Sequence, residues 1–317
     1  MKIGLDVMGG DFAPEVTVSG AILAYEHLHP HVKLVLIGDE AAIRSICARE
    51  KFDPSLFEIV HAPDTIAMGD HPSTAFAKKT QSSIYIGYEL LSKEKIDVFA
   101  SAGSTGAMMV GAMVTVKSIE GILRPAIAIA TPRADGKSNV LLDVGLNPDC
   151  KPDVLAQYGL LGSLYAEFVY NIPNPKVALL NIGAESEKGN LTTKAAHSLM
   201  CESKNYNFIG NVEGNEIFFE KADVIVCDGF VGNVLLKVVE GFSHVAKKRG
   251  IADNFFELFN PDNYGGTPVL GINSNVIIGH GASNSEAIKN MILLSQDVVE
   301  ADLPSKIRKY IKPDEQN

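Results

Sequence analysis

Residues 1–15, MKIGLDVMGGDFAPE, run an apolar strand into a glycine pair, an aspartate and a proline-started helix. Residues 3–7 are short and apolar, as a buried parallel strand is, and Pro14 suits the first helical turn, where a missing N–H is tolerated. Gly9 and Gly10 let a ligand approach the backbone, and the following helix start offers unpaired N–H groups to an anion. Taken alone, this junction predicts either an anion site or only a tight turn.

Five further junctions repeat this build, in which a strand is followed by glycine with Ser, Thr, Asn or Asp. They are residues 101–106 (SAGSTG), 143–151 (DVGLNPDCK), 181–189 (NIGAESEKG), 228–233 (DGFVGN) and 280–283 (HGAS). In an open parallel sheet such loops leave the carboxyl ends of strands, which is the edge where ligands bind. Six such loops are difficult to explain by packing alone, and we expect them to line one crevice.

Strand and helix patterns alternate along the whole chain, without a low-complexity stretch or a proline-rich linker. We therefore expect one continuous α/β domain over residues 1–317, with a mostly parallel sheet covered by helices on both faces. Helices are expected at residues 15–29, 40–50, 73–92, 105–117, 153–170, 192–203, 233–249 and 284–300. Strands are expected at residues 3–7, 33–37, 57–61, 97–100, 126–130, 139–142, 176–180, 223–227 and 276–278.

The composition indicates a cytoplasmic protein. No apolar run approaches the roughly 18 residues of a membrane span, and Lys2 is followed by a strand pattern rather than a signal peptide. The 38 acidic residues outnumber the 28 basic ones, which argues against nucleic acid as a partner. The four cysteines are widely spaced without a C-x-x-C pair, so neither a disulfide framework nor a structural zinc site is expected.

Several familiar motifs are absent from the chain. No G-x-G-x-x-G follows a strand, and neither a G-x-S-x-G elbow nor an H-E-x-x-H helix is present. Gly136, Lys137 and Ser138 resemble the end of a P-loop, but Thr131 occupies the earlier glycine position. The sequence therefore predicts anion-binding loops that work without a metal or another cofactor.

The chain contains, in this order, the stretches LDVMGGDFAP, SAGSTGA, GKSNVLLDVGLNPDCKP, LLNIGAESEKGN, KADVIVCDGFVGNVLLK and HGASN. Through these stretches the chain resembles, across nearly its full length, the bacterial phosphate acyltransferases of the PlsX family. The resemblance implies a three-layer αβα sandwich that is Rossmann-like and related to phosphotransacetylase and isocitrate dehydrogenase. It also implies a homodimer that transfers a long acyl chain from acyl carrier protein to inorganic phosphate, giving acyl phosphate for phospholipid synthesis.

Acyl transfer to phosphate requires an enzyme to desolvate a dianion, hold it near a thioester and stabilise an oxyanion. The candidate catalytic residues are Lys188, Asp228, Asn233 and His280. The candidate residues for binding phosphate or substrate are Asp6, Gly9, Gly10, Asp11, Ser101, Gly103, Ser104, Thr105, Gly106, Arg133, Asp143, Lys151, Asn181, Gly183, Gly229, Gly232 and Gly281. Phosphate supplies the nucleophilic oxygen, so no covalent Ser or Cys intermediate is required.

Most of these residues also have a structural interpretation. Lys188 could pair with Glu185 or Glu187, and Arg133 could belong to a surface hairpin. Asp228 and Ser104 could only cap helices, and His280 could be a hydrogen-bonded structural residue. Ser104 also stands where the family usually has Asn, so a side-chain amide donor is lost there.

Two other functions remain open at this stage. One is a phosphotransacetylase-like enzyme that uses a short acyl-CoA, which the preferred acyl donor would distinguish. The other is a non-catalytic scaffold that binds acyl carrier protein or membrane, which any phosphate-dependent turnover would exclude. The resemblance also implies contact with the inner face of the membrane and a downstream glycerol-3-phosphate acyltransferase as a partner.

Residues 233–266 form a helical excursion with a wide apolar face. Its apolar positions are Val234, Leu235, Val238, Val239, Phe242 and Val245, followed by Ile251, Phe255, Phe256, Leu258 and Phe259. In the family, the corresponding segment lies at the dimer interface and its tip is associated with membrane contact, although the connection here is shorter. We therefore expect a homodimer through this segment, with weak membrane binding helped by Lys247, Lys248 and Arg249.

Overall fold

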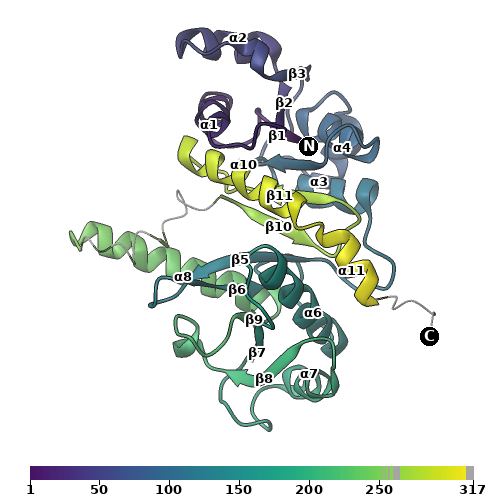
Figure 1. Ribbon diagram of the computed structural model, residues 1–317, viewed down its shortest axis with the longest axis vertical. Coiled ribbons are helices and arrows are strands. Elements are labelled where there is room, and N and C mark those ends of the chain that lie inside the picture. The colour runs from purple at the N-terminus through teal and green to yellow at the C-terminus, as the bar shows by residue number, and fades with distance from the viewer. Residues whose placement is uncertain (252, 254, 256–257, 260–264, 312–317) are drawn as a thin grey trace. The chain divides into compact units, whose positions relative to one another are not determined.

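The computed structural model describes residues 1–251, 253, 255, 258–259 and 265–311, and Figure 1 shows the course of the chain. The chain divides into two compact units. The first comprises Met1–Lys117, Pro261–Pro268 and Ile272–Glu300, and the second comprises Ser118–Asn260, Val269–Gly271 and Ala301–Asn317. The chain passes between the units several times, so no single linker separates them. One phosphate acyltransferase domain over residues 1–317 stays a prediction.

The first unit is built on strands in the order β3-β2-β1-β4-β11-β10. Their bounds are β1 (Lys2–Asp6), β2 (Lys33–Gly38), β3 (Glu58–His61), β4 (Val98–Ser101), β10 (Thr267–Leu270) and β11 (Asn275–Ile278). All neighbours are parallel except β10, which pairs antiparallel with β11 through Thr267 and Pro268. The parallel strands therefore end at one common edge.

Helices cover this sheet in two layers. They are α1 (Glu15–Tyr25), α2 (Glu40–Arg49), α3 (Pro72–Lys78), α4 (Ser83–Ser92), α5 (Thr105–Gly111) and α10 (Ser285–Glu300), with a short 3-10 turn at Pro54–Leu56. Helix α1 packs on α10, which covers β1, β4 and β11, whereas α4 packs on β1, β2 and β4. In Figure 1, α1 and α4 lie on opposite sides of β1.

The second unit has strands in the order β10-β5-β6-β9-β7-β8. Their bounds are β5 (Ala126–Pro132), β6 (Ser138–Leu142), β7 (Lys176–Leu180), β8 (Asn207–Val212) and β9 (Val224–Val226), and β10 contributes Val269 and Leu270. The four strands β6, β9, β7 and β8 are parallel, whereas β5 is antiparallel to both of its neighbours.

Among the described residues, the helices of the second unit are α6 (Pro152–Phe168), α7 (Leu191–Glu202), α8 (Gly229–Lys248) and α11 (Leu303–Ile311), with a 3-10 turn at Gly214–Glu216. Helix α6 packs on β6, β7 and β9. Gly162 allows this close approach, because a methyl group there would lie 2.5 Å from Val224 Cγ1. Helix α8 lies on the other side of these strands in Figure 1.

Hydrophobic burial explains why these segments form strands. Leu34, Leu36 and Ile37 of β2 are buried, as are Val177 and Leu179 of β7. Strands of a parallel sheet that is covered on both faces are apolar throughout rather than alternating. Removal of these side chains from water is the dominant favourable contribution to folding. The predicted mostly parallel α/β fold is therefore confirmed.

Several predicted boundaries were wrong for local reasons. Residues 73–92, expected as one helix, form α3 and α4, because the Ser82 hydroxyl caps α4 by accepting from Tyr85 N–H at 3.3 Å. By contrast, the helix expected at residues 105–117 is present, as α5 followed directly by a π-helical turn, Ala112–Val116. Strands β8 and β10 and helix α11 were not predicted. No helix among the described residues is long and apolar enough to cross a bilayer.

Candidate active-site loops

The six predicted loops fall into two groups of three, one in each unit. The loops after β1, β4 and β11 share the carboxyl edge of the first unit's parallel strands. The loops after β6, β9 and β7 share the corresponding edge of the second unit. This placement at strand carboxyl ends is the one that ligand sites of open α/β sheets use. The single crevice expected for all six loops stays a prediction.

In the first unit, the buried Asp6 carboxylate at the end of β1 joins two loops. It accepts a hydrogen bond from the Ser101 hydroxyl at 2.6 Å and another from Met8 N–H at 3.0 Å. The Ser101 oxygen in turn accepts from Gly103 N–H at 2.9 Å. Burial raises the pKa of Asp6, and its hydrogen bonds oppose that shift. Asp6 and Ser101 therefore serve to hold the loops after β1 and β4 together.

The glycines of these loops allow their backbones to touch. A methyl group at Gly9 would lie 2.4 Å from the Asp6 carboxylate and 2.6 Å from the Gly103 nitrogen. Gly10 has a φ of +116°, which favours glycine. Asp11 N–H donates to the Gly281 carbonyl at 2.7 Å, and this bond joins the loop after β1 to the loop after β11. Packing of loop on loop thus accounts for these glycines without a ligand.

The remaining candidates of the first unit occupy the starts of helices and turns. Ser104 is buried and caps α5, because its hydroxyl accepts from Ala107 N–H at 3.4 Å. Thr105 is exposed at the first position of α5, and a methyl group at Gly106 would meet Pro72 Cγ at 2.5 Å. The exposed His280 accepts from Ala282 N–H through Nδ1 at 3.2 Å, so the neutral ring carries its proton on Nε2.

In the second unit, the buried Asp143 carboxylate organises the loop after β6. Its Oδ1 accepts from Ile127 N–H at 3.1 Å and Leu146 N–H at 3.2 Å. Its Oδ2 accepts from the backbone N–H of Asn147 at 2.6 Å and from its side-chain amide at 3.0 Å. With four donors, this carboxylate is satisfied by its own chain, so Asp143 holds the loop in place rather than binding phosphate directly.

Helix α8 starts directly against this loop. A methyl group on Gly232 would lie only 1.9 Å from the Asp143 carbonyl oxygen, and one on Gly229 would lie 2.9 Å from the Asp143 carboxylate. The approach of the helix to the loop therefore leaves no room for a side chain at either position. The side chain of Asn233 reaches the same loop: a methyl group built on Gly145 of that loop would lie 3.4 Å from Asn233 Oδ1. Asp228 caps α8 by accepting from Val231 N–H at 2.8 Å. The structure therefore brings Asp143, Asp228, Gly229, Gly232 and Asn233 together.

The loop after β7 presents an unpaired cation. Asn181 donates from its amide to the Lys188 carbonyl at 3.1 Å and accepts from Ile182 N–H at 2.9 Å, which closes the loop. Gly183 lies against the Lys188 stem, because a methyl group there would be 2.7 Å from Lys188 Cγ. Lys188 is exposed, and no ion pair among the described residues includes it. The salt bridge considered for Lys188 is therefore not formed.

Lys151 lies at the same edge of the second unit. It is the exposed residue at which α6 begins, after the loop from β6, and it too forms no ion pair among the residues that the structure describes. An ammonium group beside a helix start adds to the positive end of the helix dipole. Lys151 and Lys188 therefore make this edge attractive to an anion.

Arg133 is not brought together with the other candidates. It follows β5 in the hairpin to β6, so it lies at the amino end of β6, the edge opposite the loops. Its buried guanidinium pairs with Asp135 and, at 3.2 Å, with Asp223. The pKa of Asp135 falls to about 2, chiefly because its carboxylate accepts hydrogen bonds from Arg133. The arrangement is that of a structural ion-pair network.

The cysteines near the loops are poor nucleophiles. Cys227 is fully buried, and burial raises the pKa of its thiol well above the ordinary value. Burial likewise raises the pKa of Cys150 to about 11. Because the thiolate is the reactive form, both thiols stay protonated and inert at neutral pH.

A cavity of about 680 Å³ in the second unit lies beside the loops after β7 and β9 and was missed by sequence reasoning. Most of its wall is apolar and comes from α8 and β7, while Asn181 and Asp228 also line it. The apolar face of α8 was recognised in the sequence, but the cavity forms only where α8 lies beside β7, a distant segment of the chain.

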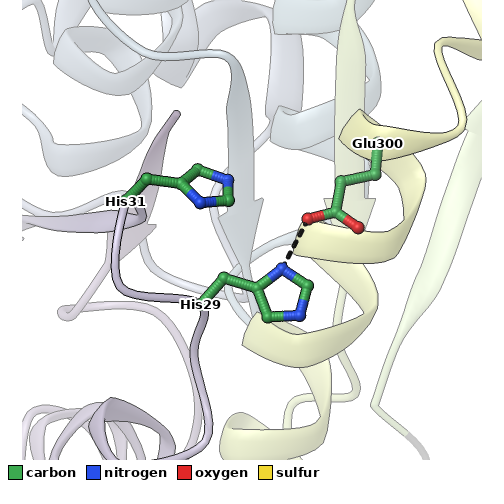
Figure 2. Close-up of side chains that lie close together, drawn as sticks. All are labelled: His29, His31 and Glu300. Atoms are coloured by element: carbon green, nitrogen blue, oxygen red, sulfur yellow. Dashed lines mark hydrogen bonds and ion pairs between the residues drawn. The ribbon is translucent and has the colours of Figure 1, made fainter.

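His29, His31 and Glu300 form a separate cluster that could hold a metal ion (Figure 2). Figure 2 shows the two imidazoles on the turn before β2 and the carboxylate on the last turn of α10. All three side chains are exposed, and Glu300 already pairs with His29 Nδ1 at 2.8 Å. The turn lies at the amino end of β2, so this cluster is not part of the loop group at the carboxyl edge.

Comparison with known proteins agrees with this architecture. A family model described as "Fatty acid synthesis protein" matches residues 1–249. The phosphate acyltransferase of Acetivibrio thermocellus is 42% identical, covering 97% of this chain and 96% of its own length. The phosphate acyltransferase of Dictyoglomus turgidum is 39% identical, covering 97% of this chain and 96% of its own length.

Solved structures show the same fold. A phosphotransacetylase from Streptococcus pyogenes superposes with a TM-score of 0.68 at 17% identity, covering 94% of each chain. The EutD phosphotransacetylase from Staphylococcus aureus gives a TM-score of 0.65 at 19% identity, again covering 94% of each chain.

The strand order and loop placement thus define an α/β protein with the fold of the phosphotransacetylases. Within that class, the chain belongs to the phosphate acyltransferase family, as its resemblance predicted.

The position of Arg133 leads to a testable prediction. Arg133→Met should lower the free energy of unfolding at pH 7, because Asp135 and Asp223 lose their partner, while the KM for phosphate should not change. The stabilising effect of the pair is present above about pH 4, where Asp135 of the unfolded chain is ionised. It is lost as pH falls toward 2, so urea unfolding of the two proteins should converge there. A raised KM for phosphate with unchanged stability would instead place Arg133 at the substrate.

Proposed function

We propose that this protein transfers a long-chain acyl group from acyl carrier protein to inorganic phosphate and so forms acyl phosphate. The observation that carries the proposal is the similarity to phosphate acyltransferases such as that of Acetivibrio thermocellus, which is 42% identical over 97% of the chain. The product is an activated acyl donor for phosphatidic acid and phospholipid synthesis. Acyl carrier protein and a downstream glycerol-3-phosphate acyltransferase are the partners that this role requires.

The reaction is a substitution at the thioester carbonyl. A phosphate oxygen attacks the carbonyl carbon and forms the carbon–oxygen bond, while the π electrons of the carbonyl move onto its oxygen and give a tetrahedral oxyanion. When the carbonyl forms again, the carbon–sulfur bond breaks and its electron pair leaves with the sulfur, which takes up the equivalent of the proton that hydrogen phosphate loses to solvent. Because negative charge gathers on the carbonyl oxygen during the attack, a positioned cation or N–H group lowers the barrier.

Lys188 is the side chain that we assign to this charge. Its ammonium is exposed in the loop after β7, has no carboxylate partner among the described residues, and is held through its backbone by Asn181. Lys151 would add to the field that attracts phosphate.

Asp228, Asn233 and His280 are proposed to position substrate or move protons. Asp228 uses one carboxylate oxygen for the α8 cap, and the structure gives its other oxygen no donor among the described residues. Asn233 offers an exposed amide beside that cap. His280 keeps a proton on Nε2 when neutral, which suits donation to an anion.

We further propose a homodimer through α8. Phe242 and Val245 are 64% and 53% exposed, and they lie on one face of the helix, beyond the residues that line the cavity. A contiguous apolar face of this kind marks an interaction surface. A second copy of α8 is the simplest matching surface, because two-fold interfaces place the same patch on both subunits.

Membrane contact through the segment after α8 is proposed to be weak. Phe259 is buried against Phe218, with ring centroids 5.3 Å apart, and Phe255 packs on Phe259 at 4.9 Å. These rings are thus engaged with their own chain, whereas Phe256 lies outside the described residues. Lys247, Lys248 and Arg249 are exposed at the end of α8, and each contributes only about 1 kcal/mol at an anionic surface.

Activity measurements test the proposed function. The purified protein should form acyl phosphate from palmitoyl-acyl carrier protein only when phosphate is present, without nucleotide or added metal. Acetyl-CoA should be a poor donor; a preference for it would favour the phosphotransacetylase-like alternative. No turnover with any thioester would favour the scaffold.

Lys188→Ala should then lower kcat about a hundredfold or more, the usual effect of losing one preorganised oxyanion partner. Lys194→Ala is the matched control, because Lys194 is also exposed and lies on α7, just beyond the same loop. Equal rates for the two variants would remove Lys188 from the mechanism.

The dimer is tested by two charges on the apolar face. Phe242→Asp with Val245→Asp should shift the protein to the mass of one chain in size-exclusion chromatography with light scattering, because carboxylates cannot be buried unpaired. His244→Asp, on the same helix but outside that face, should remain dimeric. A double variant that keeps the dimer would show that the interface lies elsewhere.

A further inference from the structure

The cavity of the second unit has an apolar wall and one polar end. Val231, Val234, Leu235 and Val238 of α8 form one side of the wall, and Leu180 of β7 contributes to the other. The α8 positions from Phe230 to Val238 span about 12 Å at about 1.5 Å per residue. The cavity is therefore elongated along the first half of α8, and its volume of about 680 Å³ is that of a ligand site.

The polar end belongs to the candidate active-site loops. Asn181 from the loop after β7, Asn190 and Thr193 from the start of α7, and Asp228 from the loop after β9 all line the cavity. Among the described residues that line the cavity, Asp228 is the only charged one, and its charge is negative. Such a wall offers no cation to a phosphate, a nucleotide or a sugar phosphate. It suits a ligand that is apolar along its length and polar at the end that reaches the loops.

The apolar lining is left in contact with water when the cavity holds no ligand. Val231, Val234 and Val238 are 40%, 46% and 49% exposed. Covering this surface is favourable in proportion to the apolar area removed from water. A hydrocarbon chain supplies that area without leaving any polar group unpaired.

We propose that this cavity holds the hydrocarbon chain of the acyl substrate and places its carbonyl end at the loops that carry Asn181 and Asp228. The proposal rests on the acyl transfer proposed above and adds the location of the chain. The side chains of α8 that line the cavity then determine how much of a long chain the protein can bind.

The binding test uses a tryptophan as reporter, because the chain contains none. Phe230 and Phe242 lie on the same helix and are both 64% exposed, but only Phe230 lines the cavity. Dibrominated stearate should quench the fluorescence of Phe230→Trp saturably, and palmitate should relieve the quenching while hexanoate does not. Phe242→Trp, the matched control, should show no saturable quenching.

Two results would overturn the proposal. Equal quenching of both reporters would show adsorption of the fatty acid along the whole apolar face of α8. A Phe230→Trp reporter that is not quenched while the protein is dimeric would show that the cavity is closed to lipid or filled by the second copy. Both results come from binding measurements that need no catalysis, so they test the cavity independently of the proposed function.

A turnover test examines the same cavity. Val234→Trp should lower the ratio of kcat/KM for palmitoyl over hexanoyl substrates about tenfold or more, since single methylene mismatches in apolar pockets already have effects of this size. His244→Trp, on the same helix but outside both the cavity and the proposed dimer face, should keep the ratio of the unmodified protein. An unchanged ratio in Val234→Trp would contradict the proposal. If neither the unmodified protein nor its variants turned over any substrate, the result would count against the proposed function. The quenching experiment would then still show whether the cavity binds a fatty acid.

Discussion

Each unit depends on one buried carboxylate at the end of a parallel strand. Asp6 follows β1 and accepts from Ser101 and from Met8 N–H, while Asp143 follows β6 and accepts four hydrogen bonds. A buried carboxylate is costly unless it is hydrogen-bonded, so each of these loops has to fold around its aspartate. The glycines beside them follow from the same constraint, because no side chain fits between loops that approach so closely.

This arrangement separates residues that build the loops from residues that are free to act. Asp6, Ser101 and Asp143 use their polar atoms on their own chain and are buried. Lys188 and Lys151 remain exposed at the edge that the buried residues create. Rigid loops with projecting cations are what preorganised electrostatic catalysis requires, because no reorganisation is needed when charge develops. The exposed ammonium groups of Lys188 and Lys151 are therefore the ones that we propose act on phosphate and the thioester.

Much of the fold could be predicted from the sequence. Parallel strands such as β2 and β7 are uniformly apolar, and the strand-to-helix loops carry recognisable glycine and polar residues. The two units could not be predicted, because residues 261–268 and 272–300 return to the first unit and no linker marks the crossing. Strand β10 was missed because it contains a proline and only four residues, Thr267–Leu270.

The candidate site was less predictable than the fold. Strand endings correctly placed Asn181, Asp143 and Asp228 at one edge of the second unit, because parallel strands end together. Arg133 was misplaced, since the sequence does not reveal that β5 runs antiparallel to β6 and ends at the opposite edge. The sequence places Glu185 and Glu187 close to Lys188, but it does not determine whether their side chains reach the ammonium group, so the absence of a salt bridge could not be predicted.

The proposed function depends on one step, the attack of a phosphate oxygen on the thioester carbonyl. The most direct test supplies palmitoyl-acyl carrier protein and phosphate labelled with ¹⁸O at every oxygen, and determines the label in the product by mass spectrometry. The account predicts acyl phosphate that retains every labelled oxygen, including the one that bridges carbon and phosphorus. A free fatty acid that carries no ¹⁸O, with no labelled acyl phosphate formed, would mean that water rather than phosphate attacks the thioester.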